Sequence, residues 1–159
     1  IRVFQKFKYM LNNTIKSDGK VNSLSPDDLT NNIVARVEAA NAIAKAKGLN
    51  FTFALQPSIY NTKKELTPFE LNILKKNKTS FPDLPTYFSS VYPLLKRKLQ
   101  KSSLNKDYIF IDIDPAISSE PLTVFTDHVH FGDRGNKLIA NFMIKYANLF
   151  GLNKSFDSK

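Results

Sequence analysis

The stretch FTFALQ, residues 51–56, is the segment that decides the fold class of this chain. Its aromatic and aliphatic side chains favour a pleated, buried backbone, and Pro57 ends it because proline offers no N–H to a sheet. A second run of this kind, YIFIDI at residues 108–113, ends at Asp114-Pro115. The two runs predict two short, buried strands.

A well-marked helix precedes the first run. Ser25 is a good N-cap residue, Pro26 suits the first helical position, and Gly48 suits the residue just after a helix end. The apolar side chains between these marks recur at helical spacing and predict one buried stripe. The stripe consists of Leu29, Ile33, Val37, Ala40 and Ala44.

Further helices are predicted at residues 66–76, 85–100 and 133–150. The second of these carries an apolar face formed by Phe88, Val91, Leu95 and Leu99. In the last, the predicted buried stripe comprises Leu138, Ile139, Phe142, Met143, Tyr146 and Leu149. The predicted order along the chain is therefore helix, strand, two helices, strand, loop and helix.

Strands that alternate with helices predict a parallel sheet with helices on both faces, a three-layer α/β/α sandwich. Two parallel strands leave two unpaired edges and offer too little surface for the apolar faces of the helices. We therefore expect further strands from sequence outside this chain or from a partner chain. Residues 1–152 are predicted to form a single α/β domain, followed by a tail at residues 153–159.

The composition limits the classes of protein to which the chain belongs. It has 159 residues, 42% of them hydrophobic, which is enough for one domain with a core. The absence of cysteine excludes disulfides and thiolate metal sites. No apolar run is long enough to span a membrane, and no signal peptide is visible in the chain. The compartment stays open, with a secreted or cell-envelope location among the alternatives.

The net charge of +9 is compatible with an anionic partner such as nucleic acid, an anionic surface or a polyanionic glycan. The Lys residues are spread along the chain, however, with denser groups only at residues 63–64, 75–78 and 96–101. After position 36 the only Arg residues are Arg97 and Arg134, and Arg is the residue that reads bases best. We therefore expect a solvated face and no specific recognition of nucleic acid.

The strongest candidate for chemistry is TDHVHFGDRGN, residues 126–136, where Asp127 and His130 lie three residues apart. A histidine acts as a general base when one ring nitrogen faces the substrate and the other donates to a fixed carboxylate. Asp127 and His130 are predicted to form such a pair, although Asp-x-x-His also occurs at ordinary helix entries. His128 adds a second imidazole, but a single turn without cysteine does not predict a closed zinc site.

The predicted position of this loop supports a functional interpretation. In open parallel sheets the reactive groups gather at the carboxyl ends of the strands. Residues 56–58, Gln-Pro-Ser, follow the first strand, and the Asp127–His130 loop comes after the second. The helix at residues 133–150 is predicted to anchor that loop.

These residues also resemble a known family. Residues 125–140, FTDHVHFGDRGNKLIA, look like the last block of SGNH (GDSL-type) hydrolases, in which Asp-x-x-His precedes a Gly-Asn turn and a helix. Residues 42–60 and 64–70 are similar to a strand and the segment after it in such proteins. The resemblance covers residues 25–150, roughly, and would correspond to the carboxyl-terminal half of a flavodoxin-like fold.

The resemblance implies a serine esterase that acts on lipid or acylated-carbohydrate esters without a metal or an organic cofactor. His130 would be the general base and Asp127 the residue that orients its ring. The family's Gly-Asp-Ser block, its oxyanion-hole Gly and its Gly-x-Asn-Asp block have no counterpart in the chain. Residues 16–19, Lys-Ser-Asp-Gly, contain similar letters in the wrong order and without a preceding strand.

We therefore expect the isolated chain to be inactive and its nucleophile to come from a missing amino-terminal segment or a complementary chain. Ser58 is the one alternative nucleophile within the chain, although a serine at this position more often closes a turn. The alternative function is a non-catalytic SGNH-like domain that binds an anionic polymer or glycan through its basic surface.

Overall fold

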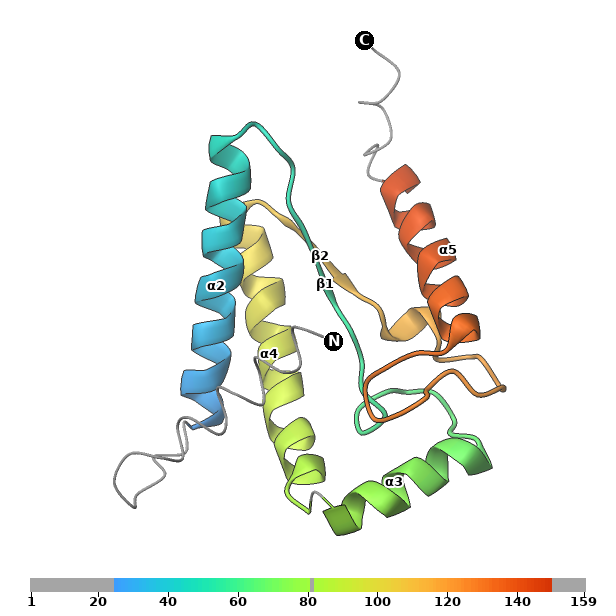
Figure 1. The fold of residues 1–159 in the computed structure, drawn as a ribbon. Helices are drawn as coiled ribbons and strands as arrows, with labels where there is room; N and C mark the ends of the chain where they lie inside the picture. The colour runs from blue at the N-terminus through green and yellow to red at the C-terminus, as the bar shows by residue number, and fades with distance from the viewer. Residues whose placement is uncertain (1–24, 81, 150–159) are drawn as a thin grey trace.

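The computed structural model describes residues 25–80 and 82–149 (Figure 1). Four α-helices, two short strands and one 3₁₀ turn make up this part of the chain. In chain order they are α2 (Pro26–Ala46), β1 (Thr52–Leu55), α3 (Pro68–Ser80), α4 (Leu84–Lys106), β2 (Ile109–Asp112), η1 (Asp114–Ala116) and α5 (Asp133–Leu149). The predicted domain limits and the tail at 153–159 involve residues outside the described ranges.

Helix α2 begins and ends as its sequence predicts. The Ser25 hydroxyl oxygen accepts a hydrogen bond from the Asp28 N–H at 3.1 Å and so caps the first turn. Beyond the last turn, Gly48 adopts a φ of +69°, the left-handed conformation that glycine tolerates best. Val37, in the middle of the predicted apolar stripe, is buried.

The two predicted strands form a parallel pair. Thr52 lies opposite Ile109, and Leu55 lies opposite Asp112 at the carboxyl end of the pair. The pairing extends beyond the strands, because the Leu55 carbonyl accepts a hydrogen bond from the Ile113 N–H at 3.1 Å. The segments that follow β1 and β2 therefore leave the sheet side by side.

The predicted three-layer α/β/α sandwich is wrong. The described residues form a mostly helical structure with a two-stranded parallel sheet and without the three layers of a sandwich. Helices α2 and α4 pack extensively against each other, whereas α3 and α5 make only limited contacts with other elements (Figure 1). The physical reason is the small size of the sheet: two four-residue strands cannot bury helices on two faces, so the longest helices bury their stripes against each other.

The buried side chains fall into two clusters. The first cluster lies where α2, α4 and the sheet meet, and its fully buried members are Val37, Leu55, Leu95, Leu99 and Tyr108. The second cluster lies beyond the carboxyl ends of the strands, and its fully buried members are Ile59, Ile117, Val124 and Phe125. The second cluster carries the predicted site.

The apolar stripe of α5 is less buried than predicted. Leu138 and Ile139 pack against the second cluster, but these two and the stripe residues Phe142, Met143 and Tyr146 are only half-buried. Among the named elements, α5 contacts chiefly η1, which covers only its first turns. Helix α5 therefore holds the loop before it at one end, and the prediction that its whole stripe is buried was wrong.

Candidate functional site

The candidate site lies at the tip of a narrow loop formed by residues 124–132. At its base the Gly132 N–H donates to the Val124 carbonyl at 2.9 Å, and Phe125 and Phe131 form an antiparallel bridge. Closer to the tip, the Thr126 N–H donates to the His130 carbonyl at 2.9 Å. The loop is thus closed by its own backbone, and residues 127–130 form its tip.

The loop brings Asp127 and His130 together. The Oδ2 of Asp127 lies 2.6 Å from the Nδ1 of His130, and the two side chains are 45% and 58% exposed. The Oδ1 of Asp127 accepts the N–H groups of Val129 at 2.8 Å and of His130 at 2.7 Å. One carboxylate therefore fixes both the backbone and the ring of His130.

The state of the Asp127 carboxyl determines the tautomer of His130. Burial by itself raises the pKa of Asp127, but the hydrogen bonds from the His130 ring and from the N–H groups of Val129 and His130 outweigh burial and lower it. An ionised carboxylate only accepts hydrogen bonds, so Nδ1 of His130 carries the proton. In the neutral ring Nε2 then holds a lone pair, as a general base requires.

The loop is attached to the segment that follows β1. The Gln56 side-chain amide donates to the Val129 carbonyl, and the Ile59 N–H donates to the His128 carbonyl at 3.0 Å. The predicted meeting of the two strand ends is therefore present in the described residues, with Gln56 next to the tip of the loop.

His128 has a different environment from His130. Its ring centroid lies 6.5 Å from that of Tyr60, which in turn stacks on Phe88 of α4. Burial lowers the pKa of His128, and the nearby His130 acts in the same direction, while the Asp127 charge opposes them. In this arrangement the Asp127 carboxylate pairs with His130, and His128 packs towards the aromatic side chains.

Ser58 occupies the buried side of a turn. It is 1% exposed, its hydroxyl donates to the Asn61 side-chain oxygen, and its N–H donates to the same oxygen at 2.9 Å. Its Oγ also accepts the Tyr60 N–H at 3.3 Å. These contacts support the interpretation of Ser58 as a turn-closing residue. Residues 16–19 lie outside the described residues.

A buried ion pair beneath the loop was missed by the sequence interpretation. The Nζ of Lys64 lies 2.8 Å from the Oε2 of Glu70, and both side chains are fully buried. The Oε1 of Glu70 accepts the N–H groups of Val124 at 2.9 Å and of Phe125 at 3.0 Å. The signal that could have revealed Glu70 is the capping-box spacing Thr67-x-x-Glu70 at the start of α3.

The start of α5 fits closely against the base of the loop. Gly135 is buried, and a side chain at its position would place Cβ 2.9 Å from the Cβ of Phe131 and 3.1 Å from the Val124 carbonyl oxygen. The Asn136 side chain donates to the Phe131 carbonyl at 3.3 Å. Gly135 and Asn136 are helical residues at the start of α5 and lie against the base of the loop.

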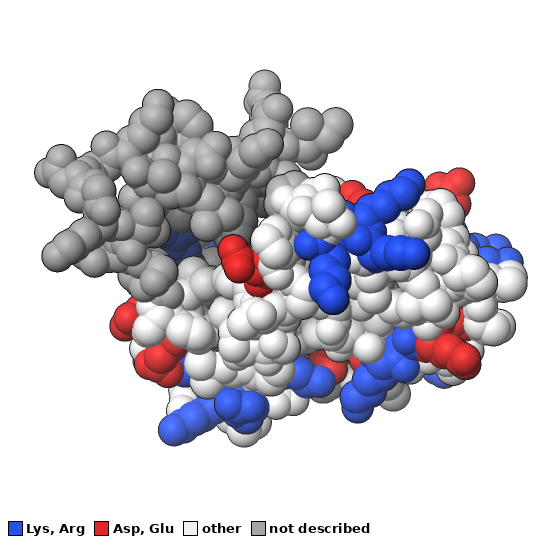
Figure 2. Space-filling view, turned by 90° about the horizontal axis from the view of Figure 1, so that it is seen from below, with Lys and Arg blue, Asp and Glu red and all other residues white. Residues whose placement is uncertain are grey.

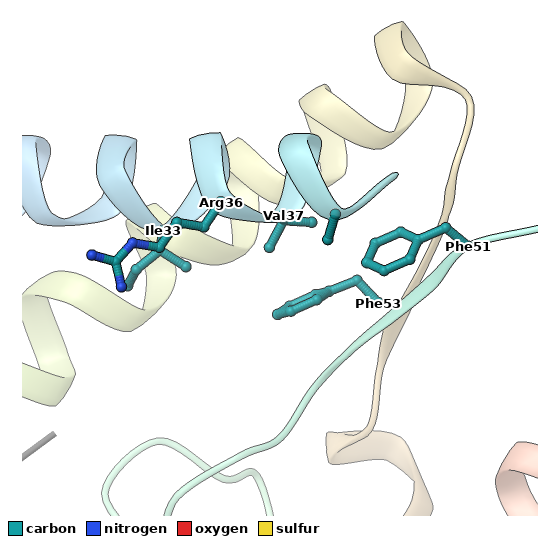
Figure 3. Close-up of a pocket in the computed structure, with 6 residues that line it drawn as sticks. Ile33, Arg36, Val37, Phe51 and Phe53 are labelled. Atoms are coloured by element: carbon teal, nitrogen blue, oxygen red, sulfur yellow. The ribbon is translucent and has the colours of Figure 1, made fainter. Parts of the chain in front are cut away.

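Two hollows of the described surface are lined by residues other than those at the tip of the loop. One, of about 320 Å³, is lined by α2 and by the residues around the start of β1, where Val37 faces the rings of Phe51 and Phe53 (Figure 3). Another, of about 340 Å³, lies along the first turns of α5. The residues described do not include a group of three or more His, Asp or Glu side chains arranged to hold a metal ion.

Positive charge is dispersed over the described surface. On the face shown in Figure 2, Lys and Arg side chains lie in separate groups, with Asp and Glu between them. Several of the Lys side chains on α2 and α4 pair with carboxylates. The pairs are Lys45 with Asp107, Lys96 with Asp112 and Lys98 with Asp27. This pattern agrees with a solvated face better than with one continuous binding surface.

Comparisons with known proteins do not identify a relative. No family model matches the chain, and neither a curated protein nor a solved structure matches it. Across the described residues, the helices lack the combination of length and apolar character needed to cross a membrane.

Proposed function

We propose that this chain supplies the Asp–His pair of an SGNH-type serine esterase, with Asp127 orienting the ring and His130 acting as general base. The observation that supports this role is the 2.6 Å contact between Asp127 Oδ2 and His130 Nδ1, on a carboxylate whose other oxygen binds the loop backbone. This geometry leaves Nε2 as the basic nitrogen.

The nucleophile in this proposal is a serine hydroxyl from an amino-terminal segment that is not part of these 159 residues, or from a complementary chain. His130 Nε2 takes the hydroxyl proton while the serine oxygen attacks the acyl carbon of the ester. The alcohol leaves with the proton from His130, and an acyl-enzyme remains. Water then attacks that ester and gives a proton to His130, which passes it to the departing serine oxygen, so that the carboxylic acid is released and the serine hydroxyl is restored.

The substrate class in this proposal is an acyl ester, with acylated carbohydrates and lipids as the candidates. The His130 side chain is 58% exposed, so the proposal expects a bulky substrate to approach it from the solvent side of the loop. None of the steps uses a metal or an organic cofactor.

The test is hydrolysis of p-nitrophenyl acetate by the complete natural polypeptide, by this 159-residue chain, and by the His130→Ala variant of the polypeptide. We expect the polypeptide to be active and His130→Ala to lower kcat/KM by at least about a thousandfold. His128→Ala is the matched control, because it removes the neighbouring imidazole and leaves the Asp127–His130 pair in place.

Two results would contradict the proposal. One is equal activity of the complete polypeptide and its His130→Ala variant. The other is a folded polypeptide without hydrolysis of this ester or of acylated glycans, together with binding to acidic glycans that weakens steeply with salt and ignores His130→Ala. The second result would establish the binding-domain alternative.

A further inference from the structure

We propose that Glu70, with Lys64 as its buried counter-ion, is a positioning residue for the Asp127–His130 pair. The inference rests on the proposed function of that pair and assigns no chemical step to Glu70. It concerns how α3, a helix more than fifty residues earlier in the sequence, fixes the loop that carries the base.

The Glu70 carboxylate binds two different parts of the chain. Its Oε2 accepts the Lys64 ammonium at 2.8 Å, the Thr67 N–H at 2.9 Å and the Thr67 hydroxyl at 3.0 Å. Among the described residues, its Oε1 accepts from the loop alone, through the N–H groups of Val124 and Phe125. Oε2 therefore serves the start of α3, and Oε1 holds the base of the loop.

A helix cap alone does not require this arrangement. In a capping box the glutamate needs one oxygen for the N-cap N–H, and here Oε2 fills that role. The contact of Oε1 with Val124 and Phe125 is not part of a capping box, and Val124 lies 54 residues after Glu70 in the sequence. The second oxygen thus connects the cap of α3 to the loop.

All the groups that face Glu70 in these contacts are donors, and this dictates a carboxylate. An amide in its place would direct an N–H towards either the loop N–H groups or Lys64 and Thr67, and one set would lose its acceptor. Lys64 has a second contact, to the Glu65 carbonyl at 2.7 Å, and balances the charge of Glu70 in a site that is fully buried.

The contact of Glu70 Oε1 with the N–H groups of Val124 and Phe125, called the clasp below, acts on Asp127 through a short stretch of backbone. Val124 is fixed on both sides, since its N–H donates to Glu70 and its carbonyl accepts the Gly132 N–H. Phe125 follows, and Asp127 is two residues further along the chain. A shift of residues 124–126, the first part of the loop, therefore changes the position of the Asp127 carboxylate relative to the His130 ring.

The first test uses NMR on the 159-residue chain and observes the nitrogen resonances of the His130 ring, which report whether Nδ1 or Nε2 carries the proton even at an exposed site where that proton exchanges with water. We expect the pattern of an Nδ1-protonated ring in the natural chain and a shift towards a mixture of the two tautomers in Glu70→Gln. Thr67→Ala is the matched control, because it weakens the cap of α3 but leaves both bonds of Oε1. Leu99→Ala, in the other core cluster, controls for a general loss of stability.

A folded Glu70→Gln variant with unchanged His130 ring resonances would overturn the inference. If Glu70→Gln does not fold, the double variant Lys64→Met/Glu70→Gln replaces it in the test, because it also removes the Lys64 charge that would be left unpaired. The expected change of the His130 resonances is the same. Hydrogen exchange in the natural chain gives a readout that needs no variant: slow exchange of the Val124 and Phe125 amides is expected, and fast exchange would contradict the clasp.

Activity separates failure of this inference from failure of the proposed function. In the complete polypeptide, a positioning role predicts that Glu70→Gln lowers kcat at least tenfold and leaves KM nearly unchanged. A natural chain without the pattern of an Nδ1-protonated His130 ring would refute the Asp–His geometry itself. A natural chain with that pattern, and unchanged kcat in Glu70→Gln, would refute only the role of Glu70.

Discussion

The unit formed by α2, α4 and the first core cluster differs from the Asp127–His130 loop in the forces that hold it. In the first unit, long helices bury aliphatic side chains such as Val37, Leu95 and Leu99 against each other and the sheet. In the loop, Val124 and Phe125 are also buried in the second cluster, but backbone closure, one carboxylate at the tip and another at the base fix the path of the chain. Apolar burial gives stability without direction, whereas hydrogen bonds to a carboxylate fix the position of particular atoms.

This difference has a testable consequence. Changes in the first unit should lower the free energy of unfolding and leave the site geometry intact in the molecules that remain folded. Changes in the loop should alter the site with a smaller effect on stability. Variants of Asp127, Leu99, Glu70 and two glycines test the two sides of this contrast.

The largest effect is expected from Asp127→Asn. The amide cannot accept on both oxygen positions, so the His130 ring loses the acceptor that places the proton on Nδ1. By analogy with other triads, we expect kcat/KM for p-nitrophenyl acetate to fall by about 10⁴-fold, or roughly 5 kcal/mol of transition-state stabilisation. The measurement is steady-state hydrolysis by the complete polypeptide.

The matched control is Asp107→Asn at the end of α4. Asp107 pairs with Lys45 at 3.0 Å, its side chain is 94% exposed, and its positive φ suits asparagine. We expect this variant to keep full activity and nearly full stability. A similar loss of activity in both variants would show that a general electrostatic effect, and not the contact with His130, accounts for the result.

In the first unit, Leu99→Ala should have the opposite profile. Leu99 is fully buried, and truncation leaves a cavity that costs roughly 2 to 5 kcal/mol in the free energy of unfolding. Urea denaturation measures this loss. Well below the melting temperature, kcat and KM should stay at their natural values, and a fall in kcat of the folded protein would break the separation between the two regions.

The loop region should respond to acid more strongly than the first unit does. Burial by itself raises the pKa of Glu70, but the bonds from Lys64, Phe125, Thr67 and Val124 lower it from 4.5 to about 2. Because the pKa is lower in the folded state, this stabilisation is complete above pH 4.5 and is lost as the pH falls towards 2. It amounts to about 3 kcal/mol.

The measurement is urea denaturation across that pH range for the natural chain and for Lys64→Met/Glu70→Gln. The two stabilities should converge as the pH falls, because only the natural chain loses the contribution of Glu70. A constant difference between the two chains from pH 4.5 down to 2 would show that Glu70 is not held in its ionised form by the clasp.

The sequence predicted the parts of the fold that depend on local patterns. The cap at Ser25, the apolar stripe of α4 and the parallel pair of strands follow from spacing and residue type over short windows. The number of layers does not follow from such windows, because it depends on how much sheet surface the helices find. That is why the alternation of elements led to a sandwich that the described residues do not form.

In the candidate site, too, the local contact was predictable from the sequence and the long-range contact was not. Asp127 and His130 are close in sequence, so their contact followed from one loop. The clasp by Glu70 was not predictable in this way, because it joins α3 to Val124 across 54 residues and involves backbone N–H groups, which have no signature in the side-chain sequence. The capping-box spacing indicated the role of one carboxylate oxygen but not of the other.

The smallest expected effects come from two glycines, one in each region. At Gly48 the space beside the residue is open and only its φ of +69° opposes a side chain, so Gly48→Ala should cost about 1 kcal/mol and leave the site unchanged. At Gly135 the added Cβ would meet the Cβ of Phe131 at 2.9 Å and the Val124 carbonyl oxygen at 3.1 Å. Gly135→Ala should cost about 1 to 3 kcal/mol and displace the base of the loop.

The measurements that distinguish the two glycines are the nitrogen resonances of the His130 ring, together with urea denaturation. These resonances should stay unchanged in Gly48→Ala and shift in Gly135→Ala, even if the two variants lose equal stability. Unchanged resonances in Gly135→Ala would mean that α5 moves away from the loop and leaves its geometry intact. Since α5 contacts chiefly η1 among the named elements, that outcome would assign the positioning of Asp127 and His130 to the loop and α3 alone.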